Sequence, residues 1–98
     1  MTKEFKKIMR EQYDLFCRKQ LNYGPDNISV GTRCETHEEQ HLSLTGLWFR
    51  MNDKINRLKQ LVLLKHADTV GESIQDSYQD LSVYGIIAQI VARGKWGK

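Results

Sequence analysis

The sequence predicts an all-α protein, a three-helix bundle-like domain that covers residues 1–98. Three stretches carry apolar residues at three- and four-residue steps, which is the spacing of one face of a helix. Turn-forming residues gather between these stretches, at 22–32 and at 66–71, and the chain holds only one proline. A chain of 98 residues forms one domain around a single modest core.

The first predicted helix runs from Thr2, its expected N-cap, to about Asn22. Its apolar face consists of Phe5, Ile8, Met9, Tyr13 and Phe16. Residues 22–27 are dense in turn formers, and residues 28–32 are short, interrupted by polar side chains and bounded by glycine. We therefore expect a loop there, or at most a fragment of strand.

The second predicted helix runs to about Lys65. Thr36 and Glu39 have the spacing of a capping box at its start, and Ser43 is a competing start. Two neighbouring stripes follow the helix. The apolar stripe is Leu44, Trp48, Met51, Ile55, Leu58 and Val62, and the polar stripe is Arg50, Asp53, Lys54 and Arg57.

The third predicted helix opens at Thr69 or Ser73 and ends at Gly94, a residue type that favours helix ends. Its expected core face is Ile74, Tyr78, Leu81, Gly85 and Ala88. Its C-terminal half is apolar nearly all round, because Val83, Ile86, Ile87 and Ile90 lie off that face. A second burying surface is needed, so we expect a homodimer that completes a larger bundle.

The charge balance favours an anionic partner. The net charge is +3 and the isoelectric point about 9.0, which suits phosphate-bearing small molecules or, less favoured, nucleic acid. No apolar run could cross a bilayer, and the charged N-terminus lacks the apolar segment of a signal peptide. We expect a cytoplasmic protein with no membrane partner. Cys17 and Cys34 have no metal-binding spacing and are interpreted as reduced thiols.

Acidic residues form one narrow stripe on the third helix, namely Glu72, Asp76 and Asp80. Like charges one turn apart repel unless something neutralises them, and Mg²⁺ (or Mn²⁺) held by carboxylates, waters and phosphate oxygens is one remedy. The alternative is a solvated acidic face, which also suits the dipole at a helix start.

The polar stripe of the second helix favours a functional site. Arg50, Lys54 and Arg57 could hold a polyphosphate, with Asp53 joining the carboxylates around the metal. The alternative is an ordinary surface with ion pairs between Asp53 and its two arginine neighbours. We favour a site because a basic and an acidic stripe occur on consecutive helices that should pack antiparallel. Tyr23 and Trp48 are candidates to stack on a base, although core or turn packing is their commoner role.

Residues 37–41 match the H-E-x-x-H pattern of zinc peptidases. A zincin needs both histidines within a helix and a third ligand, whereas His37 and His41 stand at a predicted helix entrance and no third ligand is singled out by spacing. We therefore interpret Thr36 and Glu39 as the cap and the histidines as solvent-facing. Glu35 and Glu38 remain possible donors to a metal held by Asp76 and Asp80.

Three motifs resemble a known family. They are Tyr23-Gly24, the run Arg50-Met-Asn-Asp53-Lys54-Ile-Asn-Arg57-Leu58, and the run Glu72-Ser-Ile-Gln-Asp76-Ser-Tyr-Gln-Asp80-Leu-Ser-Val-Tyr84. Together they look like the nucleotide modification associated domain, first type, a small family common in phage and bacterial genomes. The resemblance spans about residues 20–94. Asn22 stands where the family has an aspartate.

That family is similar in turn to the MazG-like all-α nucleoside triphosphate pyrophosphohydrolases. The resemblance implies a MazG-like bundle with Mg²⁺ held by acidic residues, and hydrolysis of a nucleoside triphosphate to a monophosphate and pyrophosphate. The site residues that follow are Asp53 and Asp80 for catalysis, Arg50, Lys54, Arg57 and Tyr23 for the nucleotide, and Asp53, Glu72, Asp76 and Asp80 for metal. The other hypothesis is a non-enzymatic phage accessory module that binds a nucleotide, nucleic acid or a host protein.

Overall fold

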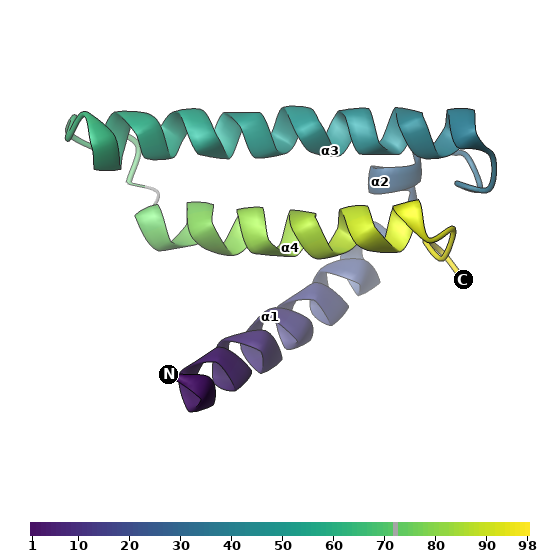
Figure 1. Cartoon of the computed structure of the whole chain (residues 1–98), viewed down its shortest axis with the longest axis horizontal. Helices are drawn as coiled ribbons and strands as arrows, with labels where there is room; N and C mark the ends of the chain where they lie inside the picture. The colour runs from purple at the N-terminus through teal and green to yellow at the C-terminus, as the bar shows by residue number, and fades with distance from the viewer. Residues whose placement is uncertain (72) are drawn as a thin grey trace.

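Two long antiparallel helices, α3 (His37–Leu58) and α4 (Ile74–Ala92), lie side by side as the frame of this computed structural model (Figure 1). The structure describes residues 1–71 and 73–98. The other elements are α1 (Thr2–Tyr23), the short α2 (Asp26–Ser29) and the π-helical turn η1 (Lys59–Leu63). No strand occurs among the described residues, so the predicted all-α class is confirmed.

Helix α1 runs obliquely beside α4 and buries none of its residues, in contrast to the close α3 and α4 pair (Figure 1). The radius of gyration is 15.0 Å, whereas a compact chain of this length has about 13 Å. The chain is thus a helical hairpin with an oblique third helix, and it is less compact than the predicted bundle. None of the described helices is both long enough and apolar enough to span a membrane.

Two local predictions at the start of the chain are wrong. Thr2 is the first residue of α1 and does not cap it, because Met1 occupies the cap position without a side-chain hydrogen bond. Residues 26–29 form α2, where a loop or a fragment of strand was predicted. Pro25 at the N-cap has φ −80°, close to the angle a helix requires, and Val30 in the left-handed region ends the helix.

The remaining helix ends follow the sequence signals closely. Thr36 and Glu39 form the complete capping box, so Ser43 is not the start but a buried residue inside α3. Ser73 is the N-cap of α4 and accepts a hydrogen bond from the Asp76 backbone. At the other end Gly94 has φ +68°, and the N–H of Lys95 reaches back to the carbonyl of Ile90. This is a Schellman motif, which satisfies carbonyls that the helix end leaves open.

The core lies where α2, the first half of α3, the second half of α4 and the C-terminal tail meet. Its buried members are Ile28, Cys34, Leu47, Ile87, Val91 and Trp96. Trp96 is only 5% exposed, donates through Nε1 to the carbonyl of Pro25 at 3.0 Å and packs edge-on against Phe16. Trp96 therefore anchors the C-terminal tail to the core.

The predicted core stripes of α3 and α4 lie one position away from the buried ones. Leu47 is 2% exposed, whereas its neighbour Trp48 is 60% exposed. On α4 Ser77 is fully buried, whereas its neighbour Tyr78 is 49% exposed. The physical reason is that Lys54 and Arg57 of the polar stripe face α4 and find partners there, so Trp48 and Ile55 point outward, whereas Leu44 still packs against the core.

Candidate functional site

The basic stripe of α3 lies in the contact between α3 and its neighbours. Arg50 donates to the carbonyl of Asn27 on α2 at 2.7 Å. Lys54 forms an ion pair with Asp80 of α4 at 3.1 Å, with both side chains about a fifth exposed. The prediction that the basic stripe of α3 faces the acidic stripe of α4 is confirmed for this pair.

Arg57 is the most constrained of the three cations. Its guanidinium donates to the Ser73 carbonyl at 3.1 Å and to the Ser77 hydroxyl at 3.0 Å, and it pairs with Asp68 at 3.2 Å. These contacts join the end of α3, the connection after η1 and the start of α4. Arg57 therefore has a structural role at this end of the hairpin, in addition to the phosphate role that the sequence suggested.

A pocket of about 230 Å³ opens where α1, α2, α3 and α4 meet. Three of the predicted site residues line it, one aromatic, one cationic and one acidic: Tyr23, Arg50 and Asp80. Its other polar lining residues come from α1, the α2 region and α4, namely Lys19, Gln20, Asn27, Gln79 and Tyr84, and the remaining lining residues are apolar. The pocket thus combines two cations, one carboxylate and two tyrosines in one hollow.

Sequence reasoning missed Lys19, Asn27 and Gln79 as lining residues. Lys19 belongs to α1, and its place depends on the angle at which α1 crosses α4, which periodicity does not encode. Asn27 lay in a predicted loop. Tyr84 was present in the third motif, so the family pattern was the one signal that pointed to it.

The described carboxylates that were predicted to bind metal do not form one cluster. Asp53 and Asp76 are both exposed, and Asp80 lines the pocket. Glu72 lies outside the described residues. In the rest of the chain no three His, Cys, Asp or Glu side chains lie close enough together to hold a metal ion. The four-carboxylate metal site therefore stays a prediction.

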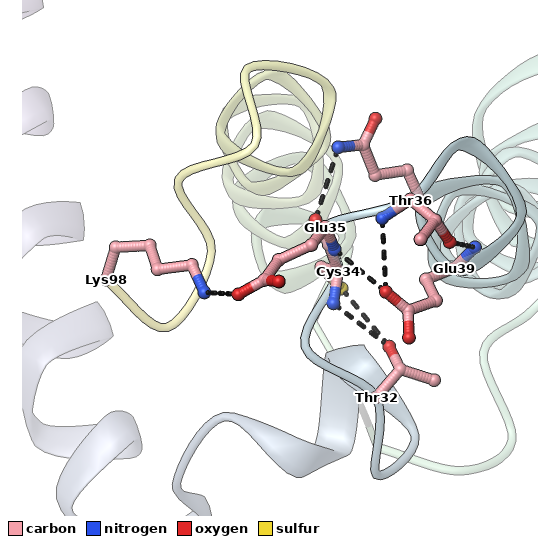
Figure 2. A network of polar contacts seen from close by, with 7 residues as sticks. Thr32, Cys34, Glu35, Thr36, Glu39 and Lys98 are labelled. Carbon is pink, nitrogen blue, oxygen red and sulfur yellow. Dashed lines mark hydrogen bonds and ion pairs between the residues drawn. The ribbon is translucent and has the colours of Figure 1, made fainter.

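The segment with the zincin pattern is the capped entrance of α3 (Figure 2). The carboxylate of Glu39 accepts from the backbone N–H groups of Thr36 and Glu35, and these hydrogen bonds hold the pKa of Glu39 below its usual value. Glu35 pairs with Lys98 at 2.7 Å, and the ammonium group lowers the pKa of Glu35 in the same way.

His37 is the first residue of α3 and His41 lies one turn later, and both are exposed as expected. The zinc interpretation finds no third ligand beside them among the residues described. The possibility that Glu35 shares a metal with Asp76 and Asp80 is wrong, because α3 and α4 are antiparallel. Glu35 precedes α3 and pairs with the C-terminal residue, at the opposite end of the hairpin from Asp76 (Figures 1 and 2).

Trp48 does not line the pocket. Its ring packs edge-on against Phe49 at 5.4 Å on the outside of α3, so it is not placed to stack on a ligand held by Arg50. Tyr23, the other aromatic candidate, is at the pocket wall and keeps that role as a prediction.

Comparison with known proteins finds one family. Residues 44–91 match the model of the family described as nucleotide modification associated domain 1, and this match supports the family resemblance drawn from the motifs. Searches of curated proteins and of solved structures find no match. The matched segment runs from the first turns of α3 to the last turn of α4, so it holds two of the three motifs and the Lys54 to Asp80 ion pair. The α3 and α4 hairpin is thus the part of this chain that is similar to the nucleotide modification associated domain 1 family.

Proposed function

We propose that this chain is a Mg²⁺-dependent nucleotide-binding protein whose ligand occupies the pocket between α1, α2, α3 and α4. The proposed reaction is the hydrolysis of free or modified deoxynucleoside triphosphates to monophosphate and pyrophosphate, within phage nucleotide metabolism. The observation that carries the proposal is the meeting of Lys19, Arg50, Asp80 and two tyrosines in one hollow. The family match at residues 44–91 supports it independently.

The two cations suit phosphate oxygens. A guanidinium has five N–H donors in a planar fork, and the hydrogen bond of Arg50 to Asn27 uses one of them. Lys19 adds a point charge from α1 to the pocket lining. Ligand pockets commonly measure about 300 to 1000 Å³, so a hollow of about 230 Å³ fits one end of a nucleotide better than the whole.

The carboxylates suit Mg²⁺ in an incomplete protein cage. Mg²⁺ usually takes one or two carboxylates and completes its shell with waters and substrate phosphate oxygens. Asp80 at the pocket and Asp53, one turn along α3 from Arg50, supply that number. A bound Mg²⁺ would neutralise phosphate charge and activate water. Lys54, which pairs with Asp80, orients that carboxylate.

The test is a panel of canonical and modified nucleoside triphosphates with Mg²⁺, with pyrophosphate and orthophosphate measured separately. Lys19→Ala should weaken nucleotide binding about tenfold or more, whereas Arg18→Ala should bind as wild type, because Arg18 is a neighbouring exposed cation outside the pocket. Asp80→Asn should remove the Mg²⁺ dependence. Binding that is equal in all four proteins would refute the pocket, and absence of pyrophosphate would refute the hydrolase.

A second candidate is a non-enzymatic module that binds nucleic acid. The charge of α1 favours it, since α1 carries six basic and three acidic residues, an excess equal to the net charge of +3 of the whole chain. Lys3, Lys6, Lys7 and Arg10 are all exposed. Affinity for DNA oligomers that falls steeply with salt, together with no affinity for nucleotides, would favour this alternative.

A homodimer is the last part of the proposal. The apolar side chains Ile86 on α4 and Trp48 and Ile55 on α3 are about half exposed or more, and a monomer that leaves so many large apolar groups in water is uncommon.

A further inference from the structure

A second hollow, of about 240 Å³, lies between α1 and α4, where α1 runs obliquely beside α4 (Figure 1). Helix α1 buries none of its residues, and its side chains Met9 and Tyr13 stay more than half exposed. Most residues around the hollow are apolar and none is charged: Met9, Gln12, Tyr13, Phe16, Val83, Ile86, Ile87 and Ile90. We call this hollow the apolar groove.

The two polar side chains of the apolar groove are already engaged within the chain. Gln12 accepts a hydrogen bond from Ser82 at 2.6 Å. Tyr13 has a hydrogen bond with Cys17 one turn later, which raises the pKa of the Tyr13 phenol. A polar ligand would lose its water here and find few new hydrogen bonds, which costs free energy, whereas an apolar ligand gains from burial. The groove therefore selects an apolar group.

The apolar groove adjoins a wider hollow of about 500 Å³ at the C-terminal tail, because Phe16 and Ile90 line both. Among the residues described, the charged ones that line the wider hollow are two lysines, Lys95 and Lys98. Lys98 pairs with Glu35 at 2.7 Å, whereas Lys95 is exposed and has no carboxylate partner in the described part of the chain. An apolar groove that ends at a cation is complementary to an apolar chain that ends in an anion.

Size and charge narrow the class of ligand. Pockets for drug-sized molecules commonly measure about 300 to 1000 Å³, so a groove of about 240 Å³ suits a single apolar chain better than the two chains of a membrane lipid. No arginine of the described chain lines either hollow. The lone ammonium of Lys95 is a point charge that matches a singly charged carboxylate better than a phosphate monoester, which carries nearly two charges.

We infer that this chain has a second binding site, in which the apolar groove takes the chain of a single-chain carboxylate and Lys95 binds its carboxylate group. The site goes beyond the proposed function, because none of Lys19, Arg50 and Asp80 lines either of its hollows. The two sites meet only at apolar side chains that line both, namely Phe16, Val83 and Ile87.

Isothermal titration calorimetry of the full chain with hexanoate, octanoate and decanoate, below the concentrations at which they form micelles, tests the groove. Affinity should rise about three- to fourfold for each added methylene, since each one is buried. Ile86→Ser should weaken decanoate binding about tenfold, because Ile86 is 49% exposed and lines the groove. Ile74→Ser is the matched control, because Ile74 is an isoleucine of the same helix, 39% exposed, outside both hollows.

The charged end is tested with decanoate and decanol, which have the same chain. Lys95→Ala should weaken decanoate binding about three- to fivefold, as loss of an exposed ion pair does, and should leave decanol binding unchanged. Lys59→Ala is the control, because Lys59 is an exposed lysine of η1 at the opposite end of the hairpin (Figure 1). An equal effect of Lys95→Ala on both ligands would overturn the place given to the carboxylate.

Two further results would overturn the site as a whole. One is affinity that does not rise with chain length in the wild type, or that falls equally in Ile86→Ser and Ile74→Ser. The other is a wild-type dimer that Ile86→Ser dissociates in analytical ultracentrifugation, because a second copy would then cover the groove. Helical circular dichroism of each variant checks that the fold is kept. Nucleotide binding is measured separately, so a failure of this site leaves the nucleotide pocket standing.

Discussion

Trp96 is expected to be the largest single contributor to stability in the C-terminal tail. Its ring is 5% exposed, lies edge-on to Phe16 with centroids 6.1 Å apart, and its Nε1 donates to the Pro25 carbonyl at 3.0 Å. Replacing a buried aromatic residue by alanine costs about 3 to 5 kcal/mol. Trp96→Phe keeps an aromatic ring and loses the hydrogen bond, which contributes about 1 kcal/mol.

Thermal unfolding followed by circular dichroism separates these two effects. A loss of about 1 kcal/mol lowers Tm by about 4 to 8 °C in a domain of this size. We therefore expect Trp96→Phe to lie in that range and Trp96→Ala to lose at least about 12 °C. The control is Leu21→Ala, because Leu21 is 87% exposed and its loss should change stability by no more than about 0.5 kcal/mol. If Trp96→Ala unfolds at the wild-type temperature, the tail does not fasten α4 to the α1 and α2 turn.

Three further predictions concern the helix ends and the hairpin. Arg57→Ala should destabilise the chain by about 2 to 3 kcal/mol in urea unfolding, because the fully buried Ser77 hydroxyl loses the donor of its hydrogen bond. Arg57→Lys should not restore wild-type stability, since lysine lacks the planar fork of the guanidinium. Full rescue by lysine would contradict this role of Arg57. Thr36→Ala should cost about 1 kcal/mol by removing the cap of α3, and an unchanged urea midpoint would refute the role of the capping box. Because the pKa of Glu39 is lowered in the folded chain, its carboxylate contributes stability that is fully present above the ordinary pKa of 4.5. That stability is lost as the pH falls through the lowered pKa. Tm should therefore decline as the pH falls below about 4.5, and Glu39→Gln, which keeps an acceptor without a titrating charge, should flatten that decline; identical slopes would refute it.

The helix ends were readable from the sequence because their signals are local. Thr36 with Glu39, Ser73, and Gly94 each act within a few residues, and all three do in the structure what their spacing indicated. Thr2 failed as a cap because Met1 takes the cap position and Thr2 is already the first helical residue, with no side-chain hydrogen bond to fix the start. The short helix α2 was missed because four residues carry no periodicity.

The residues predicted for the core at Trp48 and Tyr78 lie one position along the chain from the buried residues Leu47 and Ser77. Apolar periodicity gives the direction of an apolar face but not the partner that covers it. On α3 the apolar stripe through Trp48 and Ile55 is the stronger signal, yet the chain buries Leu47 and pairs Lys54 with Asp80 of α4. The sequence pattern therefore assigned to the core side chains such as Trp48 and Ile55, which are more than half exposed in the structure.

Part of the candidate site could be predicted from the sequence. Periodicity and antiparallel packing predicted that the basic stripe of α3 faces the acidic stripe of α4, and the Lys54 to Asp80 ion pair is where the two stripes meet. The pocket needs in addition the angle of α1, which brings Lys19 and Tyr23 to the same hollow as Arg50. Phe16 of α1 packs against Trp96, 80 residues later in the chain. No local pattern encodes such a contact.

The central claim is that a nucleotide binds in the pocket between α1, α2, α3 and α4. Titration of a ¹⁵N-labelled sample with a deoxynucleoside triphosphate and Mg²⁺, followed by amide chemical shifts, tests it most directly. We expect the largest shifts at Lys19, Tyr23, Asn27, Arg50 and Asp80, with little change at Trp48 and Ile55, which do not line the pocket. Shifts that are absent across the nucleotide panel, or that gather around His37 and His41, would contradict the account.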